Sequence, residues 1–121
     1  MKKKICVLED DRGIRDMLDL LLSGEDYEIN SFCCIKDFLY AKRNYIPDLY
    51  LLDVRLPDGN GLEVCRMLNG NTDTARIPVV MMSADIDANQ INVSCKAKAF
   101  MAKPFDIYHI LDSIKFALKS A

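Results

Sequence analysis

Acidic residues stand directly after two short apolar runs of this sequence. Glu9–Asp11 follows the run Ile5–Leu8, and Asp53 follows the run Leu49–Leu52. If both runs are neighbouring parallel strands, their ends meet at one edge of the sheet and the carboxylates converge. Two unit charges 4 Å apart repel each other by roughly 4 kcal/mol at an effective dielectric of 20, so such a group requires a cation. Oxygen ligands without His or Cys favour Mg2+, with Mn2+ as the alternative.

Two further polar residues, Ser83 and Lys103, follow later apolar runs and complete a chemical set with Asp10 and Asp53. A carboxylate beside Mg2+ and an ammonium group is equipped for in-line attack on a phosphoryl group. The lysine and the serine hydroxyl would stabilise charge on the phosphoryl oxygens. The simpler role for each acid alone is a helix cap, and Asp11 fits that role. Asp53 fits it less well, because it ends a wholly apolar run, where an unused carboxylate is costly.

These residues need a scaffold, and apolar runs alternate with helical patterns along the whole chain. We expect strands at 5–8, 27–32, 49–52, 77–82 and 99–102. Apolar residues recur at helical spacing in five segments, which begin near Ile14, Ile35, Leu62, Ile86 and Ile107. The segment 86–96 is the weakest of these helices, because it is rich in poor helix formers. Five βα units in this length predict one α/β domain, residues 1–121, with a flavodoxin-like, doubly wound, five-stranded parallel sheet of order 2-1-3-4-5 flanked by five helices.

The composition argues against several classes of function. With 16 basic and 18 acidic residues the formal net charge is -2, which predicts no direct binding of nucleic acid. No apolar run is long enough to span a bilayer or to serve as a secretory signal, so we expect a cytoplasmic protein with no membrane partner. The five cysteines lack metal-type spacing, and we expect free thiols that act as small apolar residues. A redox role for the adjacent Cys33 and Cys34 is the alternative.

Taken in order, these motifs resemble the response-regulator receiver family over essentially the whole chain. The segments that carry the resemblance are Val7–Asp11, Ile14–Arg15, Leu51–Gly61, Met81–Ala84 and Lys103–Phe105. The resemblance implies a phosphoacceptor domain of a two-component phosphorelay. A histidine kinase or histidine phosphotransfer domain would donate a phosphoryl group to Asp53, and phosphorylation would switch the binding of a partner. Such a domain is not an ordinary enzyme, although it catalyses its own phosphorylation and slow dephosphorylation.

The resemblance also implies a role for each residue around the phosphoacceptor. Asp53 would be both the phosphoacceptor and a metal ligand. Asp10 and the backbone carbonyl of Arg55 would be direct metal ligands, and Glu9 would act through a water molecule. Lys103 would bind the phosphoryl group with its ammonium. These assignments require all five residues to meet at one edge of the sheet.

The remaining implied roles concern switching and docking. Ser83 and Phe100 stand at the family's switch positions. The second position more often holds Tyr, so coupling at Phe100 would rest on ring packing alone, and a plain core residue is the alternative. The peptide bond before Pro104 is expected to be cis. The surface that docks the kinase or phosphotransfer partner would consist of Ile14, Arg15, Leu18, Pro104 and Phe105. A mainly core role for Ile14 and Leu18 is the alternative.

Two departures from the family pattern lead to further expectations. Lys98 and Ala99 replace acids that commonly support a symmetric dimer, so a monomer is expected while Asp53 is unphosphorylated. Arg55 and Asp85 each lie two residues after a site residue. We expect them to form an ion pair that limits attack of water on the phosphoryl group; two solvated surface charges are the alternative.

Three other functions are less consistent with the residues. A nucleotide- or flavin-binding fold would need a glycine or hydroxyl loop where Glu9–Arg12 stands, and acids there repel phosphate without a cation. A phosphate-independent scaffold would not need the complete set of site residues. A phosphohydrolase of small substrates usually has an acid/base Asp two residues after its nucleophile, where Arg55 stands.

Overall fold

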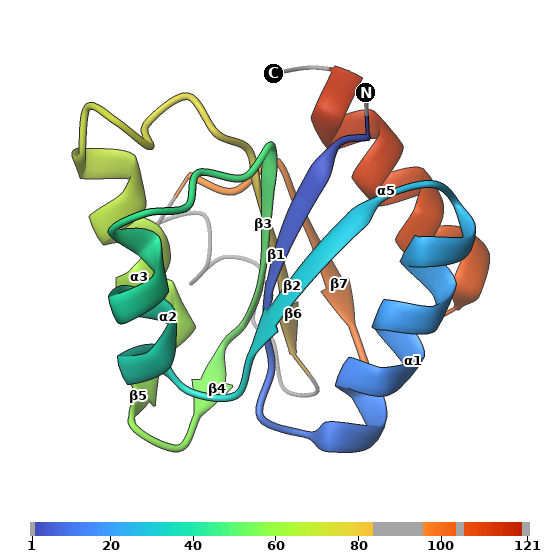
Figure 1. The fold of residues 1–121 in the computed structure, drawn as a ribbon, viewed down its shortest axis with the longest axis horizontal. Coiled ribbons are helices and arrows are strands. Elements are labelled where there is room, and N and C mark those ends of the chain that lie inside the picture. The colour runs from blue at the N-terminus through green and yellow to red at the C-terminus, as the bar shows by residue number, and fades with distance from the viewer. Residues whose placement is uncertain (1, 84–95, 104–105, 120–121) are drawn as a thin grey trace.

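A five-stranded parallel sheet forms the centre of the molecule in the computed structural model, which describes residues 2–83, 96–103 and 106–119 (Figure 1). The strand order is β2-β1-β3-β6-β7, and every neighbouring pair is parallel. The strands are β1 (Lys4–Leu8), β2 (Glu28–Phe32), β3 (Leu49–Asp53), β6 (Val79–Ser83) and β7 (Ala99–Ala102). In chain order this is the predicted 2-1-3-4-5 sheet, so the flavodoxin-like topology is confirmed.

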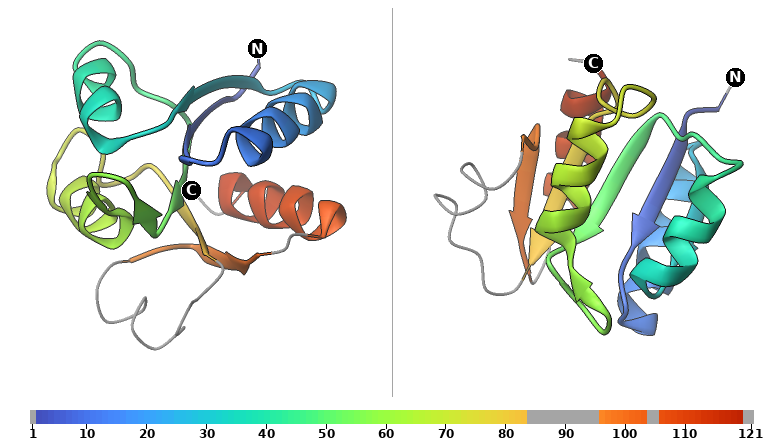
Figure 2. Two further views of the ribbon diagram at one scale, coloured as in Figure 1. Left: turned by 90° about the horizontal axis from the view of Figure 1, so that it is seen from below. Right: turned by 90° about the vertical axis from the view of Figure 1, so that its left-hand side faces the viewer.

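Helices cover both faces of this sheet (Figure 2). On one face lie α1 (Arg12–Gly24) and α5 (Ile107–Lys119), and on the other lie α2 (Ile35–Lys42) and α3 (Gly61–Gly70). The predicted helix at 86–96 falls almost wholly outside the described residues, so four of the five expected helices are seen. Within the described ranges, no helix is long and apolar enough to cross a membrane.

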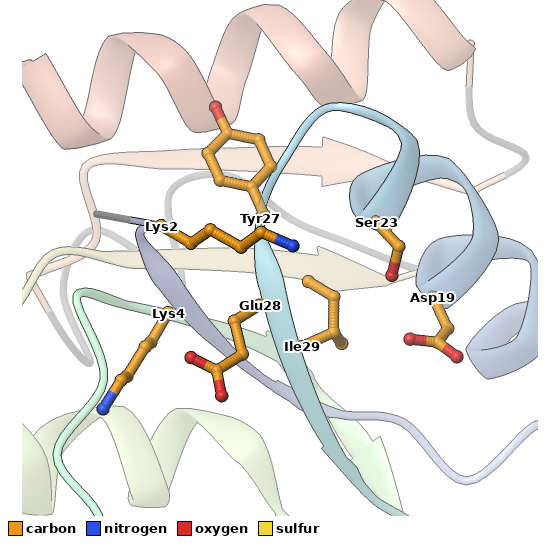
Figure 3. Close-up of a pocket in the computed structure, with 7 residues that line it drawn as sticks. All are labelled: Lys2, Lys4, Asp19, Ser23, Tyr27, Glu28 and Ile29. Atoms are coloured by element: carbon orange, nitrogen blue, oxygen red, sulfur yellow. The ribbon is translucent and has the colours of Figure 1, made fainter.

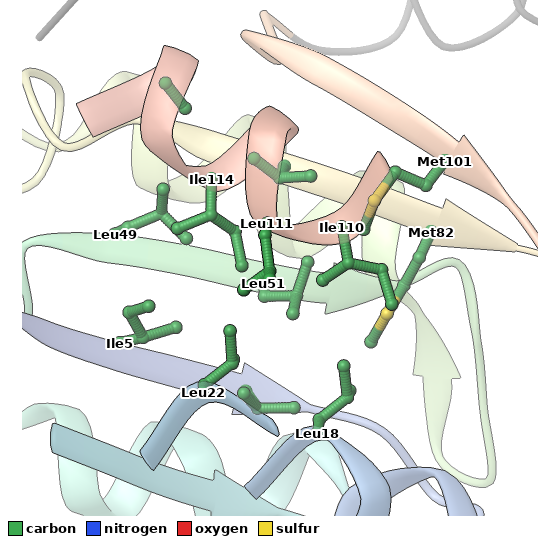
Figure 4. Close-up of a cluster of buried hydrophobic side chains, with 13 residues drawn as sticks. Ile5, Leu18, Leu22, Leu49, Leu51, Met82, Met101, Ile110, Leu111 and Ile114 are labelled. Carbon is green, nitrogen blue, oxygen red and sulfur yellow. The ribbon is translucent and has the colours of Figure 1, made fainter. Parts of the chain in front are cut away.

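The central strand β3 is buried on both faces, and its side chains divide between two cores. Leu49 and Leu51 pack with α1 and α5 (Figure 4), whereas Tyr50 and Leu52 pack with α2 and α3. Each fully buried leucine stabilises the fold by roughly 1.5–3 kcal/mol. Burial on both sides is typical of a central parallel strand, and here it delivers Asp53 to the carboxyl edge of the sheet.

The fourth strand of the sheet begins two residues later than predicted, at Val79 rather than Ile77. The Ile77 amide donates to the Thr74 carbonyl at 3.0 Å and closes a turn instead of joining the ladder. Pro78 has no amide hydrogen to donate, although its carbonyl accepts from the Tyr50 amide at 3.0 Å. The strand therefore starts after the proline.

A short hairpin follows β3 and was not predicted. It pairs β4 (Arg55–Leu56) with β5 (Gly59–Asn60) in antiparallel fashion. In the turn between them, the Asp58 carboxylate accepts hydrogen bonds from the amides of Ile35 at 2.8 Å and Lys36 at 2.9 Å. These are the first amides of α2, so a residue from a distant loop caps this helix.

Removing the Asp58 carboxylate is expected to destabilise α2 and the loop that follows β3. The hydrogen bonds from Ile35 and Lys36 lower the pKa of Asp58 in the folded state. A carboxylate with a lowered pKa stabilises the fold above its unfolded pKa, and that stability is lost as pH falls through the folded value. Asp58→Ala should therefore lower Tm by about 2–5 °C at pH 7, and the difference should shrink in acid.

Thermal unfolding followed by circular dichroism between pH 3 and pH 7 measures this effect. Asp73→Ala, which removes an exposed carboxylate from another turn, is the matched control and should leave Tm unchanged. Equal Tm values for Asp58→Ala and the parent at neutral pH would contradict the capping role.

Candidate functional site

Three carboxylates meet at the carboxyl ends of β1 and β3. Leu8 and Leu52 are paired in the sheet, so Glu9 and Asp53 leave neighbouring strand ends side by side. Oxygen atoms of Glu9, Asp10 and Asp53 all lie within 4.8 Å of one another. Glu9 is fully buried and Asp53 is 4% exposed, whereas Asp10 is exposed. The convergence that the sequence predicted is thus present.

The Lys103 ammonium bridges two of these carboxylates. Its Nζ lies 2.5 Å from Glu9 Oε1 and 3.0 Å from Asp53 Oδ2. The Lys103 amide also donates to the Ser83 carbonyl at 3.0 Å, which fixes the chain just after β7 against the end of β6. Burial opposes the ammonium form, but the hydrogen bonds to Glu9 and Asp53 outweigh it and raise the pKa of Lys103. The amine is therefore charged at neutral pH.

Glu9 lies at the bottom of the site. Burial raises the pKa of Glu9 to about 7; the hydrogen bond from Lys103 lowers it, and the Asp53 carboxylate raises it. The second Glu9 oxygen, Oε2, accepts from the Asp11 amide at 3.1 Å. Three carboxylates against one ammonium leave an excess of negative charge when all are ionised. A divalent cation would relieve this excess and favour the deprotonated form of Glu9.

Arg15 holds the backbone of the acidic turn. Its Nη1 donates to the carbonyl oxygens of Glu9 and Asp10, both at 2.9 Å. The half-buried guanidinium was predicted to dock a partner, and the structure gives it this positioning contact inside the protein. The prediction that Leu18 contributes to docking is wrong, because its side chain is fully buried in the core beneath α1. Ile14 is half-buried and packs against the same core.

Gly61 packs directly against the backbone of Asp53. A Cβ atom at position 61 would lie 1.9 Å from the Asp53 carbonyl oxygen, so no side chain fits there. The Gly61 amide donates to the Val54 carbonyl at 2.7 Å, and the Val54 amide donates to the Met82 carbonyl at 3.0 Å. These contacts fix the chain on either side of the carboxylate. This close contact was not predicted; the position of Gly61 directly after the Asn60 cap, as the first residue of α3, was the available signal.

Other predicted residues lie near the site to different degrees. Ser83 is buried as the last residue of β6, the strand that pairs with β3. Phe100 is half-buried in β7 and packs against the core shared with α2 and α3. Arg55 is exposed in β4. Asp85, Pro104 and Phe105 fall outside the described residues. The ion pair between Arg55 and Asp85, the cis bond before Pro104 and the part of the docking surface at Pro104 and Phe105 therefore stay predictions.

The four cysteines among the described residues divide into two groups, and Cys95 lies outside them. Cys6 and Cys65 are buried in the core, as predicted. Cys33 is a free thiol, as predicted, but it does not serve as a buried apolar residue: it is exposed because it follows the end of β2 and precedes α2, where the chain leaves the sheet. Cys34 is partly buried at the N-cap of α2.

A hollow of about 610 Å3 lies at the opposite edge of the sheet, near the start of β1 and β2 (Figure 3). Its lining includes Lys2, Lys4, Asp19 and Glu28, so both signs of charge are present. It is open to solvent and far along the strands from the carboxylate cluster. Among the described residues, the carboxylate cluster and its lysine therefore lie at the carboxyl ends of the strands, away from this hollow.

Comparison with known proteins gives one family. The sequence matches the model described as "response regulator receiver domain" over residues 5–115. It is 31% identical to the DNA-binding response regulator MtrA of Mycobacterium tuberculosis, over 98% of this chain and 52% of that protein. It is also 31% identical to the transcriptional regulatory protein GltR of Pseudomonas aeruginosa, over 98% of this chain and 50% of that protein. The chain spans about half the length of these curated relatives.

Solved structures show the same fold. A putative response regulator from Chloroflexus aurantiacus superposes with a TM-score of 0.91 at 25% identity, covering 98% of this chain and 99% of that one. The receiver domain of the sensor histidine kinase PA1611 from Pseudomonas aeruginosa, solved with a magnesium ion in its active site cleft, gives a TM-score of 0.87 at 16% identity, covering 98% of this chain and 99% of that one.

Proposed function

The chain belongs to the response regulator receiver domain family, and we propose that it accepts a phosphoryl group on Asp53 in a Mg2+-dependent reaction. The observation that carries the proposal is the meeting of the Glu9, Asp10 and Asp53 carboxylates with the Lys103 ammonium. A nucleophile, candidate metal ligands and a phosphate-binding cation thus share one small volume. The sequence motifs and the geometry of the site support the same assignment.

The residues present fit a hard divalent cation. The described donor set is made of carboxylate oxygens, which suits Mg2+ or Mn2+ rather than a softer metal. Asp10 and Asp53 would hold the ion directly with the Arg55 carbonyl, and Glu9 would act through water. When bound, the ion would neutralise negative charge on the phosphoryl oxygens. The magnesium in the receiver domain of PA1611 is consistent with this choice.

Phosphoryl transfer would use groups that already stand in place. An Asp53 oxygen attacks phosphorus and forms a P–O bond, while the P–N bond to the donor histidine breaks and its electron pair leaves on the imidazole nitrogen. No general base is needed, because the attacking carboxylate carries no proton. Lys103, 3.0 Å from Asp53, would move its hydrogen bond to a phosphoryl oxygen, and the Ser83 hydroxyl would bind another.

Partner binding would couple to this chemistry. A histidine kinase or phosphotransfer domain would approach the open side of the carboxyl edge, along the exposed part of α1. Phosphorylation would then rearrange Ser83 and Phe100 and change the affinity for a target. Given its net charge of -2, we expect this chain not to bind nucleic acid directly, and we expect it to act in the cytoplasm as a monomer when unphosphorylated.

Incubation with a small-molecule phosphodonor and Mg2+ tests the proposal. Intact mass spectrometry should show the gain of one phosphoryl group per chain, which disappears in Asp53→Asn and when a chelator replaces Mg2+. Asp48→Asn is the matched control, since it changes an acid near the start of β3, at the other end of the strand. Equal phosphorylation of Asp53→Asn and the parent would reject Asp53 as the acceptor.

A further inference from the structure

A second group of side chains with potential metal-ligand atoms lies outside the proposed phosphoacceptor site. Cys33 and Cys34 follow the end of β2, and Asp37 lies in the first turn of α2. One ligand atom from each of the three lies within 4.8 Å of the other two. Both thiols are free, Cys33 and Asp37 are exposed, and Cys34 is partly buried. An ion in solvent can therefore reach all three.

We propose that Cys33, Cys34 and Asp37 form a binding site for a thiophilic divalent cation of the Zn2+ or Cd2+ type. Two sulfurs and one carboxylate oxygen are ligands that zinc commonly takes, with water filling the fourth position of a tetrahedral site. Sulfur ligands select such ions over Mg2+. The site differs in its chemistry from the oxygen-only cluster around Asp53.

The distances agree with this geometry. Cys33 Sγ lies 4.0 Å from Asp37 Oδ2. Sulfur and oxygen ligands of a tetrahedral zinc ion are separated by roughly 3.6 Å, given Zn–S and Zn–O bonds of about 2.3 and 2.1 Å. A shift of a few tenths of an ångström would bring this pair to the coordination distance. Exposed side chains at a strand-to-helix turn can make such a shift at little cost.

The capping arrangement of α2 leaves Cys34 available as a ligand. Cys34 stands at the N-cap, yet its side chain makes no capping hydrogen bond. Asp58 supplies the cap from the hairpin loop, through the amides of Ile35 and Lys36. With two thiolates and Asp37 as ligands, the loaded site would carry a net charge of -1, which the positive end of the helix stabilises.

Titration of the reduced full chain with Cd2+, in saturating Mg2+, tests the proposal. The Mg2+ occupies the oxygen site, and the ultraviolet thiolate-to-cadmium absorption reports only sulfur ligation. We expect one Cd2+ per chain to produce this band. Cys33→Ser and Cys34→Ser should each weaken binding by at least about 100-fold, and Asp37→Asn by about tenfold or more.

The controls separate this site from the rest of the chain. Glu28→Gln changes an exposed acid at the start of β2, the strand that precedes the site, and this variant should bind Cd2+ as the parent does. The double variant Cys33→Ser/Cys34→Ser keeps Cys6, Cys65 and Cys95; a band that survives in it would assign the metal to those thiols and overturn the proposal. Absence of any band in the reduced parent would overturn it as well. Phosphorylation of Asp53 in the double variant is expected to remain intact, so failure here and failure of the phosphoacceptor are distinguishable.

Discussion

Lys103→Met is expected to slow phosphorylation of Asp53 by about 100- to 1,000-fold while Mg2+ binding persists. Methionine has a similar reach but no charge, so it removes the cation that lies 3.0 Å from Asp53 Oδ2. Without that ammonium, more negative charge remains among the carboxylates, and Mg2+ should bind as tightly as before or more tightly. Slower phosphorylation with unchanged or tighter Mg2+ binding would show that the variant has lost its contact with the phosphoryl group and has kept the metal ion.

Rates of acyl phosphate-driven phosphorylation at saturating Mg2+, together with a Mg2+ titration, measure both quantities. Lys98→Met is the matched control, because Lys98 is an exposed lysine just before the same strand, β7. A phosphorylation rate within about twofold of the parent would show that Lys103 does not serve the reaction.

Gly61→Ala is expected to destabilise the protein by roughly 2–4 kcal/mol and to lower Asp53 phosphorylation by about 100-fold. The added methyl group would lie 1.9 Å from the Asp53 carbonyl oxygen, so the strand end, the helix start or both must move. A shift of about 1 Å at the nucleophile spoils its alignment with the metal ligands and Lys103. One methyl group should therefore affect both stability and chemistry.

Urea unfolding and the phosphorylation assay test this prediction on the same samples. Gly70→Ala provides a close control, since it adds the same methyl group at the other end of α3, where nothing lies within 4 Å. Alanine there should be neutral or slightly stabilising. If Gly61→Ala unfolds at the same urea concentration as the parent, the close approach to Asp53 has no energetic consequence.

Much of the fold followed from patterns that extend over several residues. The alternation of apolar runs with helical patterns predicted the five-stranded sheet, in which the wholly apolar run that ends at Asp53 forms the central strand β3. Strand ends then placed Glu9 and Asp53 together through the topology rule alone. Periodicity carries this information because a buried face must repeat along its element.

Features that depend on single contacts were not predictable in this way. The strands of the β4–β5 hairpin have two residues each, too few to show a period. The Asp58 cap joins segments more than 20 positions apart, and the residues around Asp58 do not indicate which helix it caps. The close contact at Gly61 was not predictable, because it depends on which backbone atoms an added Cβ atom would meet in the folded chain. The direct contact of Lys103 with Glu9 depends on how far one flexible side chain reaches, which spacing does not encode.

The distance along the chain between Asp53 and Lys103, 50 residues, has a consequence during synthesis on the ribosome. The nascent polypeptide exposes Asp53 long before Lys103, its partner in the folded site, emerges. Strand β7 is an edge strand, so it must still dock onto β6 before the ammonium reaches the acids. Translation adds about 5–20 residues per second, which makes the interval a matter of seconds. If Asp53 accepts phosphate as proposed, the unfinished chain would be a poor acceptor during this interval, and incomplete molecules would not consume the phosphodonor.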